Sequence, residues 1–467
     1  MNHGGRMSFR KLMFVVIFIT AITASGLLVS QWNLLADVDA EENHHYQRIK
    51  TFAESLSLVK KNYVEDVEEK DLVYGAIKGM LNSLDPHSAF MPPEAFKELK
   101  VDTKGEFGGL GIQIGIKNKI LTIIAPIEDT PAYEAGVKAG DMIIKIEGKS
   151  TKDITLYEAV SKLRGRKGTK VTITIAREGL DKPKDFTITR DIIKLKSVKS
   201  RVIDEEIGYV KLTQFQEKTA ADLKKALKDL AKKDISSLVL DLRNNPGGLL
   251  KGAVDVTSQF LPSGKLVVYI KGRDGDKTKF HTKNGSKYYD YPMVVLVNEG
   301  SASASEIVAG ALQDWEHALI LGTQTFGKGS VQTVMPLSDG SALRLTTARY
   351  YTPKDRSIQT TGITPDIIVK LEAKNGAKTH HILREKDLDK HLDNDIDDDE
   401  AVTEDDRDMD KDKDEDTGSK LDNITDKPAE PSDLVPVKVA DEDDNQLQRA
   451  VDLLKSWKVF KKLPKAG

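Results

Sequence analysis

The sequence predicts an α/β core, with a sheet covered by helices, preceded by an inserted small β domain and a helical N-terminal segment and followed by a disordered acidic linker. From about residue 191, buried strands such as SLVLDLR (237–243) alternate with helical runs such as AADLKKALKDLAKK (220–233). Residues 101–190 instead form short strands bounded by glycines, and residues 41–100 repeat apolar residues at helical intervals. The domains expected are 1–40, 41–100, 101–190, 191–375, 376–440 and 441–467.

The composition excludes several classes of function. At 467 residues the chain is long enough for two or three domains. It has no cysteine, so disulfides, thiolate metal sites and a cysteine nucleophile are excluded, although export is not. A net charge of −3 gives no indication of nucleic-acid binding.

Residues 1–40 read as an export signal. The stretch 12–30 carries no charge and follows a basic start. Cleavage after Ala40 is one expectation, but the uncharged run continues to Ala36, which is long enough to span a bilayer. A removed signal peptide and a retained inner-membrane anchor both stay open. A buried soluble helix fits poorly, because basic flanks stand on one side only. We expect a periplasmic or extracytoplasmic location.

Residues 41–100 predict helices over 46–64 and 72–84, broken by DPHSAFMPPEAF (85–96). His87 lies in this break. We interpret it as a structural hydrogen-bonding residue, because no cluster of other ligand residues surrounds it in the sequence.

Residues 101–190 predict a peptide-binding module. In GEFGGLGIQIG (105–115), Gly108, Gly109 and Gly111 mark a loop with exposed N–H groups, which captures a terminal carboxylate. Leu110 and Ile112 lead into a strand with a free edge for an extended peptide. An unrelated small β domain is the alternative, since glycine-rich hairpins are common.

Ser303 is the candidate nucleophile. In NEGSASASEI (298–307) it lies where the strand 293–297 becomes a helix, so backbone holds its hydroxyl near unpaired helix N–H groups. Lys328 is the candidate base, because no other charge occurs between 325 and 334 and a lysine accepts a proton only when its pKa is lowered. Gln332, four residues on, can hold the amine without neutralising it.

The segment DLRNNPGG (241–248) predicts a strand that ends in a turn opening a helix. The N–H of Gly247 or Gly248, together with that of Ala304, would form an oxyanion hole. A plain strand-to-helix turn is the alternative, and the choice between the two glycines stays open.

Taken together, SLDPHSAF (83–90), TPAYEAGVKAGDMIIKIEG (130–148), DLRNNPGG, NEGSASASEI, GTQTFGKGSVQT (322–333) and TARYYTPKDRSIQTTGITPD (347–366) resemble the carboxyl-terminal processing proteases. These are tail-specific serine peptidases of the S41 type with a PDZ domain. The resemblance runs from about residue 41 to 371 and implies Ser303 as nucleophile, Lys328 as base and Gln332 as its orienting residue. Asp355 stands where the family usually has glycine, and aspartate tolerates the left-handed backbone expected there.

This resemblance implies an endopeptidase that recognises protein C-termini and needs no metal or cofactor. Its partners would be protein or peptide substrates with free C-termini and the inner membrane; an adaptor or activating protein and a homo-oligomer stay open. A non-catalytic PDZ peptide-binding protein of the cell envelope is the main alternative. A nucleotide-binding loop at 322–329 fails, because Gly329 offers no hydroxyl to magnesium and a β-rich segment follows. A histidine-dependent serine hydrolase also fits poorly, since no G-x-S-x-G occurs.

The C-terminal part begins with a disordered linker. Between Asp393 and Asp416 stand fifteen acidic and three basic residues, too few of them apolar to support folding. Acidic residues also fall at calcium-loop positions there, but Asp398 replaces the required glycine, so an EF-hand is disfavoured. Residues 443–456 then predict a helix that packs on the core.

Overall fold

A computed structural model of the chain describes residues 46–177, 179–283, 289–372, 383–394 and 443–461. The predicted export signal and residues 376–382 and 395–440 of the predicted acidic linker lie outside these residues. Residues 383–394, also assigned to the disordered linker, are instead ordered, because the buried Glu385 binds the core. The chain divides into two units, Met1–Met80 and Leu81–Gly467. In the first unit, residues 46–62 form a helix, and α2 (Glu69–Asn82) begins. Among the described residues, no helix has the length and apolar character needed to cross a membrane.

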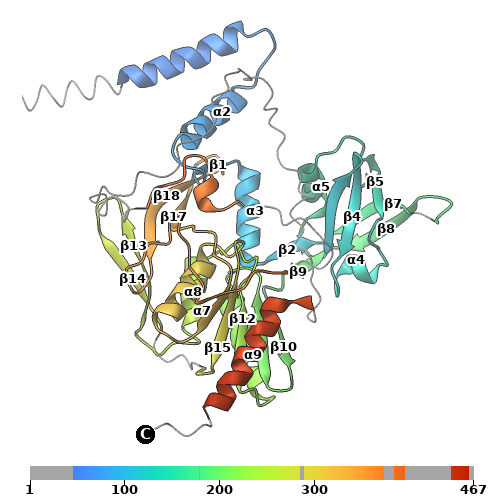
Figure 1. The fold of residues 1–467 in the computed structure, drawn as a ribbon. Coiled ribbons are helices and arrows are strands. Elements are labelled where there is room, and N and C mark those ends of the chain that lie inside the picture. The colour runs from blue at the N-terminus through green and yellow to red at the C-terminus, as the bar shows by residue number, and fades with distance from the viewer. Residues whose placement is uncertain (1–45, 178, 284–288, 373–382, 395–442, 462–467) are drawn as a thin grey trace, which may run out of the picture. The chain divides into compact units, whose positions relative to one another are not determined.

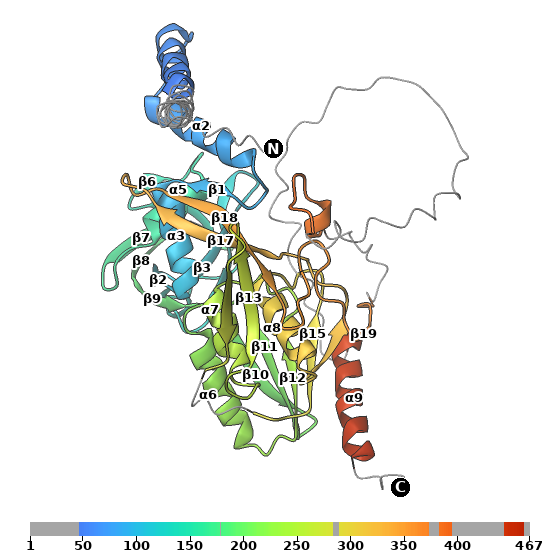
Figure 2. The same ribbon diagram turned by 90° about the vertical axis from the view of Figure 1, so that its left-hand side faces the viewer.

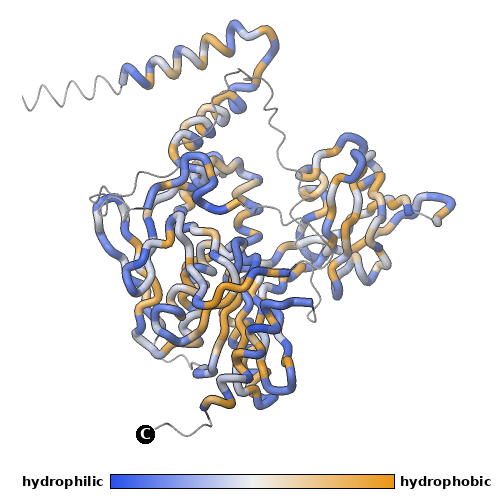
Figure 3. Tube along the Cα trace, viewed as in Figure 1, coloured by the Kyte–Doolittle hydropathy of each residue, from blue (hydrophilic) through white to orange (hydrophobic). Residues whose placement is uncertain are grey.

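The second unit is built on a six-stranded sheet (Figure 1). β10 and β11 are antiparallel, and the remaining neighbours are parallel. Figure 3 shows these strands as a hydrophobic centre, as expected for strands that are covered on both faces. In order across the sheet, the strands are β10 (Val198–Ile203), β11 (Ile207–Leu212), β12 (Ser237–Asp241), β15 (Met293–Val297), β16 (Leu319–Gly322) and β19 (Ile367–Ile368).

Helices cover both faces of this sheet. α6 (Thr219–Ala231), α7 (Leu250–Thr257) and α8 (Ala304–Asp314) share one core with alternate strand residues. α9 (Asn445–Phe460) packs Leu447, Ala450, Val451 and Leu454 on the other set of alternate residues. Figure 2 shows α6 and α9 on opposite sides of the sheet. The predicted α/β core and its C-terminal helix are therefore confirmed.

Buried charges fix the start of α9. Asp444 caps the helix by accepting from the N–H of Leu447 at 3.0 Å. Its carboxylate also binds the Arg243 guanidinium at 2.7 and 2.8 Å, and Arg243 pairs with the buried Asp241 as well. Because Arg243 lies four residues before Gly247, α9 is tied to the segment that carries the predicted oxyanion glycines.

A second sheet brings the strand that follows Lys328 beside the break predicted at residues 85–96. β18 (Ala342–Tyr351) pairs with β1 (Ala89–Met91), β13 (Leu266–Gly272) and β17 (Ser330–Pro336), and β14 (Lys277–His281) pairs with β13. Ala89 lies opposite Arg344 in this register. Asp355 has φ 59°, so the left-handed turn expected at this position is present.

The inserted domain has its own core and a five-strand path with β3 at one edge. The chain enters and leaves it through a two-stranded ribbon, β2 (Glu106–Gly109) and β9 (Asp191–Lys194). α3 (Pro93–Lys104) precedes the ribbon, so the boundary predicted at residue 100 falls inside a helix. Its other elements are β3 (Ile112–Lys117), β4 (Ile120–Pro126), α4 (Pro131–Glu134), β5 (Met142–Ile146), β6 (Lys149–Ser150), α5 (Leu156–Leu163), β7 (Lys170–Ala176) and β8 (Lys184–Thr189).

Candidate active site

Ser303 stands at the N-terminus of α8 with a positive φ of 55° and a ψ of −113°. Such a backbone is costly for a residue with a Cβ and needs support from its surroundings. The two neighbouring serines have structural bonds instead. Ser301 donates to the carbonyl of Leu242 and Ser305 to that of Asn245, each at 2.8 Å. Of the three, only Ser303 has a hydroxyl that donates no hydrogen bond within the described part of the chain.

The glycine turn of DLRNNPGG packs directly against Ser303. A Cβ added at Gly247 would lie 2.9 Å from both the Ser303 Cβ and the Ala304 nitrogen. The N–H of Gly247 donates to the side chain of Asn245 at 3.0 Å. Among the described residues, the N–H groups of Gly248 and Ala304 have no acceptor. These two N–H groups are therefore available to a ligand.

Glu306 binds the serine turn and the lysine loop together, a role that the sequence reasoning missed. One carboxylate oxygen accepts from the N–H of Ser303 at 2.8 Å and of Lys328 at 3.0 Å. The other accepts from the Thr325 hydroxyl at 2.6 Å and the Gly327 N–H at 2.7 Å. Burial raises the pKa of Glu306 to about 7, against these four hydrogen bonds.

Lys328 lies in the loop between β16 and β17, and it is half-buried. Burial and then the positive charge of Arg344 lower its pKa below the ordinary value, against Glu385, Asp85 and Glu306. No hydrogen bond or ion pair joins its Nζ to any residue in the described ranges. Lys328 thus has the electrostatic setting that the sequence reasoning required of a base.

Gln332 lies on β17 and donates to the hydroxyls of Ser330 at 3.0 Å and Thr346 at 3.3 Å. Thr346 in turn donates to Asp85 at 3.2 Å. Burial acts to raise the pKa of Asp85, but hydrogen bonds led by that of Ser88 outweigh it and lower the pKa. In this structure Gln332 is therefore held by neighbours of Lys328 rather than bonded to its amine.

Tyr350 completes the surroundings of Ser303. Its phenol is fully buried, and burial together with the Glu306 charge raises its pKa well above the ordinary value. The Ser303 side chain acts on that pKa in the opposite direction, which places the two hydroxyls close together. No hydrogen bond of ordinary geometry joins them.

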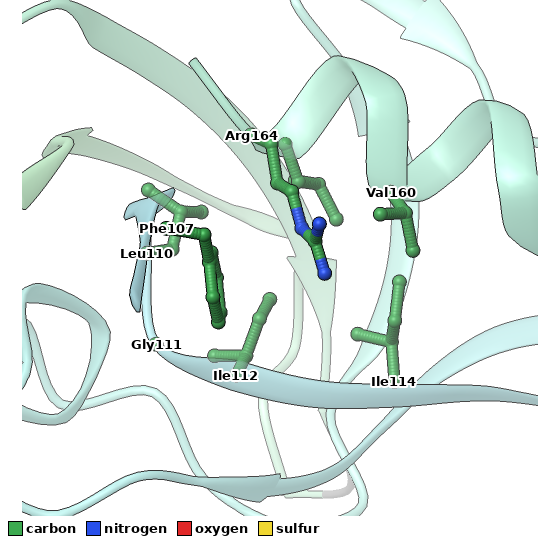
Figure 4. Close-up of a pocket in the computed structure, with 8 residues that line it drawn as sticks. Phe107, Leu110, Gly111, Ile112, Ile114, Val160 and Arg164 are labelled. Carbon is green, nitrogen blue, oxygen red and sulfur yellow. The ribbon is translucent and has the colours of Figure 1, made fainter. Parts of the chain in front are cut away.

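A second candidate site lies on the inserted domain, between the edge strand β3 and α5 (Figure 4). It is a small groove with a cavity of about 70 Å³. The predicted residues Leu110, Gly111 and Ile112 line it. Gly108 and Gly109, which pair with β9 in the ribbon, do not line it. The sequence reasoning missed its other lining residues, Phe107, Ile114, Val160, Leu163 and Arg164.

Gly108 and Arg164 explain this arrangement. A Cβ at Gly108 would lie 2.1 Å from the carbonyl oxygen of Gly165, so the ribbon approaches the end of α5 only through glycine. Arg164 packs 4.3 Å from the centre of the Phe107 ring and forms an ion pair with Glu98 of α3. The groove therefore combines apolar walls with one cation at its rim.

The resemblance inferred from motifs extends over most of the chain. Residues 206–369 match peptidase family S41, residues 122–177 match the PDZ domain, and residues 18–95 match the N-terminal domain of the activating protease CtpB. A carboxy-terminal-processing protease of Bartonella bacilliformis is 47% identical over 81% of this chain and 88% of its own length. A carboxyl-terminal-processing protease of Synechocystis is 39% identical over 74% and 80%.

Among solved structures, the photosystem II D1 C-terminal processing protease is 32% identical, covers 68% of this chain and 92% of its own, and gives a TM-score of 0.42. The two family matches define a peptidase with a PDZ domain. This chain belongs to the carboxyl-terminal processing proteases of peptidase family S41. The alternative of a non-catalytic peptide-binding protein is thereby set aside.

Proposed function

We propose that this protease recognises protein C-termini through its PDZ groove and cleaves by a Ser303–Lys328 mechanism. The observation that carries the proposal is the shared carboxylate of Glu306, which fixes the serine turn and the lysine loop against each other. The lowered pKa of Lys328 supports its role, because a base must be neutral before it accepts a proton.

In the proposed reaction, Ser303 Oγ forms a bond to the scissile carbonyl carbon while its proton passes to the Lys328 amine. The carbonyl π electrons move onto oxygen, where the N–H groups of Gly248 and Ala304 bind the negative charge. Collapse breaks the C–N bond, and the Lys328 ammonium returns the proton to the leaving amine. Water then cleaves the ester with Lys328 again as base.

The PDZ groove supports recognition of a chain end. The free edge of β3 suits an extended peptide, while Ile112, Ile114 and Val160 offer an apolar wall for its last side chain. The test is cleavage of one unstructured polypeptide with a free or an amidated C-terminus. We expect amidation to reduce kcat/KM at least tenfold for the native protein. Equal rates would contradict recognition of the terminal carboxylate.

Action on exported proteins is also part of the proposal, supported by the uncharged stretch 12–30 after a basic start. N-terminal sequencing of the protein from cells distinguishes a removed signal from a retained anchor. Digestion of intact spheroplasts by an added protease tests the side of the membrane. Protection of residues 46–461 in intact spheroplasts would contradict export.

A further inference from the structure

The segment 383–394, which we name the strap, lies beyond the part of the chain that matches the peptidase family and returns to the lysine loop. Its short helix η1 spans Glu385–Asp387. The N–H of Glu385 donates to the carbonyl of Phe326 at 3.1 Å, and the Arg384 guanidinium donates to the carbonyl of Thr325 at 3.1 Å. The strap thus binds the loop within three residues of Lys328.

The Glu385 side chain is fully buried at this junction. Its carboxylate contacts Nε2 of His87 at 2.7 and 2.9 Å and accepts from the amide of Gln359 at 2.9 Å. The Gln359 carbonyl oxygen accepts in turn from the N–H of Gly329 at 3.0 Å. One carboxylate therefore connects three distant segments, and one of these connections ends beside Lys328.

Within the described ranges, four charged groups act on the pKa of Lys328: Arg344 of β18, Asp85 before β1, Glu306 of α8 and Glu385 of the strap. Glu385 is the foremost of the three carboxylates that oppose the lowering of the lysine pKa. His87 contacts both the positive group and one of the negative groups. Its backbone carbonyl accepts from Arg344 at 3.0 Å, and its ring contacts the Glu385 carboxylate.

We propose that Glu385 is a positioning residue for the general base: the strap holds the lysine loop through it, and its charge offsets that of Arg344. This inference rests on the proposed role of Lys328. A buried carboxylate with ordered partners fixes geometry as well as charge, so its removal changes both the loop and the pH at which Lys328 becomes neutral.

The sign of the pH effect follows from the charge. Replacing Glu385 by glutamine removes a negative charge near Lys328, and a lysine with less negative charge nearby loses its proton at lower pH. We therefore expect Glu385→Gln to move the acid limb of kcat/KM to lower pH by about half a unit or more. Glu385→Ala also removes the bonds to His87 and Gln359, and should lower the plateau kcat at least tenfold with KM within twofold.

Asp387→Asn is the matched control. It removes the same charge from the same short helix, but Asp387 is exposed, and its carboxylate accepts from the N–H of Arg384 rather than facing Lys328. The assay uses full-length protein in mild detergent and an unstructured fluorogenic peptide, with thermal unfolding measured for every variant. Asp387→Asn should keep the wild-type pH profile.

Lys328→Ala tests the assignment of Lys328 as the base separately from the positioning role of Glu385. If it is inactive while Glu385→Gln and Asp387→Asn both give the wild-type profile, the positioning role of Glu385 is wrong and the base assignment stands. The same conclusion follows if Glu385→Ala loses activity only in proportion to unfolding. If Lys328→Ala retains activity, both the base assignment and the role of Glu385 are overturned.

Discussion

The backbone N–H groups of Ser303 and Lys328 donate to the same oxygen, Oε2 of Glu306, at 2.8 and 3.0 Å. Twenty-five residues separate them in the sequence, and neither side chain takes part in the connection. The relative position of the two candidate catalytic residues is therefore set by main-chain groups that a side-chain substitution at 303 or 328 leaves in place. Variants at these two positions thus report on chemistry rather than on folding.

Replacing the three serines one at a time should separate chemistry from stability. Ser303→Ala should abolish turnover and leave thermal unfolding unchanged. Ser301→Ala and Ser305→Ala each remove one hydrogen bond to a buried carbonyl, but the N–H of Asn245 still donates to Leu242 and that of Ala302 to Asn245. Each should therefore cost about 0.5–1.5 kcal/mol of stability while keeping activity. Peptide cleavage and denaturant unfolding measure the two effects. An inactive but stable Ser301→Ala would contradict the assignment.

Activity should rise with pH through the lowered pKa of Lys328, because the neutral amine is the active form and its fraction grows as pH increases. Lys328→Arg should lose about three orders of magnitude in kcat, since a guanidinium stays protonated. The measurement is kcat/KM across pH. Lys228→Arg, on α6, is the control, and an arginine variant at 328 with near-native turnover would remove Lys328 from the mechanism.

Glu306→Gln should damage both stability and activity. The glutamine amide nitrogen is itself a donor, so it faces two of the groups that now donate hydrogen bonds to the carboxylate. We therefore expect the free energy of unfolding to fall by about 3 kcal/mol or more. Turnover should fall at least a hundredfold, because the serine turn and lysine loop lose their common anchor. The exposed Glu316, just past α8, provides the control Glu316→Gln. Wild-type unfolding of Glu306→Gln would show that the anchor is dispensable.

The raised pKa of Glu306 adds a pH dependence of stability. Its folded pKa, about 7, lies above the ordinary value of 4.5. The folded protein therefore binds this proton more tightly than the unfolded chain, and the contribution of Glu306 to stability falls as pH rises from about 4.5 to 7. Denaturant midpoints measured across this range for the wild type and Glu306→Gln should differ in slope. Parallel curves would contradict the assignment.

Removing the inserted domain tests whether it only tethers substrate or also controls the core. Gly109 and Asp191 lie opposite each other at the end of the ribbon, so deleting 110–190 and joining them by a two-residue turn closes a hairpin without moving α3. We expect the rate of short-peptide cleavage to change, because the domain is held at both ends and Arg164 already contacts α3. An unchanged rate in a folded deletion variant would leave tethering as its only role.

Local patterns in the sequence were sufficient to predict the strand-turn-helix that carries Ser303. The strand-turn-helix at 293–314 rests on a short apolar run and helical spacing, both of which are local. The tolerance of Asp355 for a left-handed backbone was also a local inference, and its φ of 59° confirms it. The contact between Glu306 and the Ser303 backbone could also have been predicted, since the two residues have the spacing of a capping box.

The residues that surround Lys328 could not be predicted from local sequence patterns. His87 and Glu385 are 298 residues apart, and no periodicity reports such a pairing. Asp85 reaches the lysine loop only because β1 joins β18. The glycines at 108 and 109 show a different limit, because a close backbone approach and an anion-binding loop both favour glycine. Only the register of the ribbon distinguishes them.

The position of α9 in the chain has a consequence for biosynthesis. β16 ends at Gly322, but the helix that covers the second face of its sheet begins at Asn445. Because a chain is delivered from its N-terminus, whether by a ribosome or by an export channel, this apolar face stays uncovered until α9 follows. During that interval Arg243 has not yet met Asp444. Formation of the layer behind the oxyanion segment therefore depends on a helix that lies far downstream of β16 in the sequence.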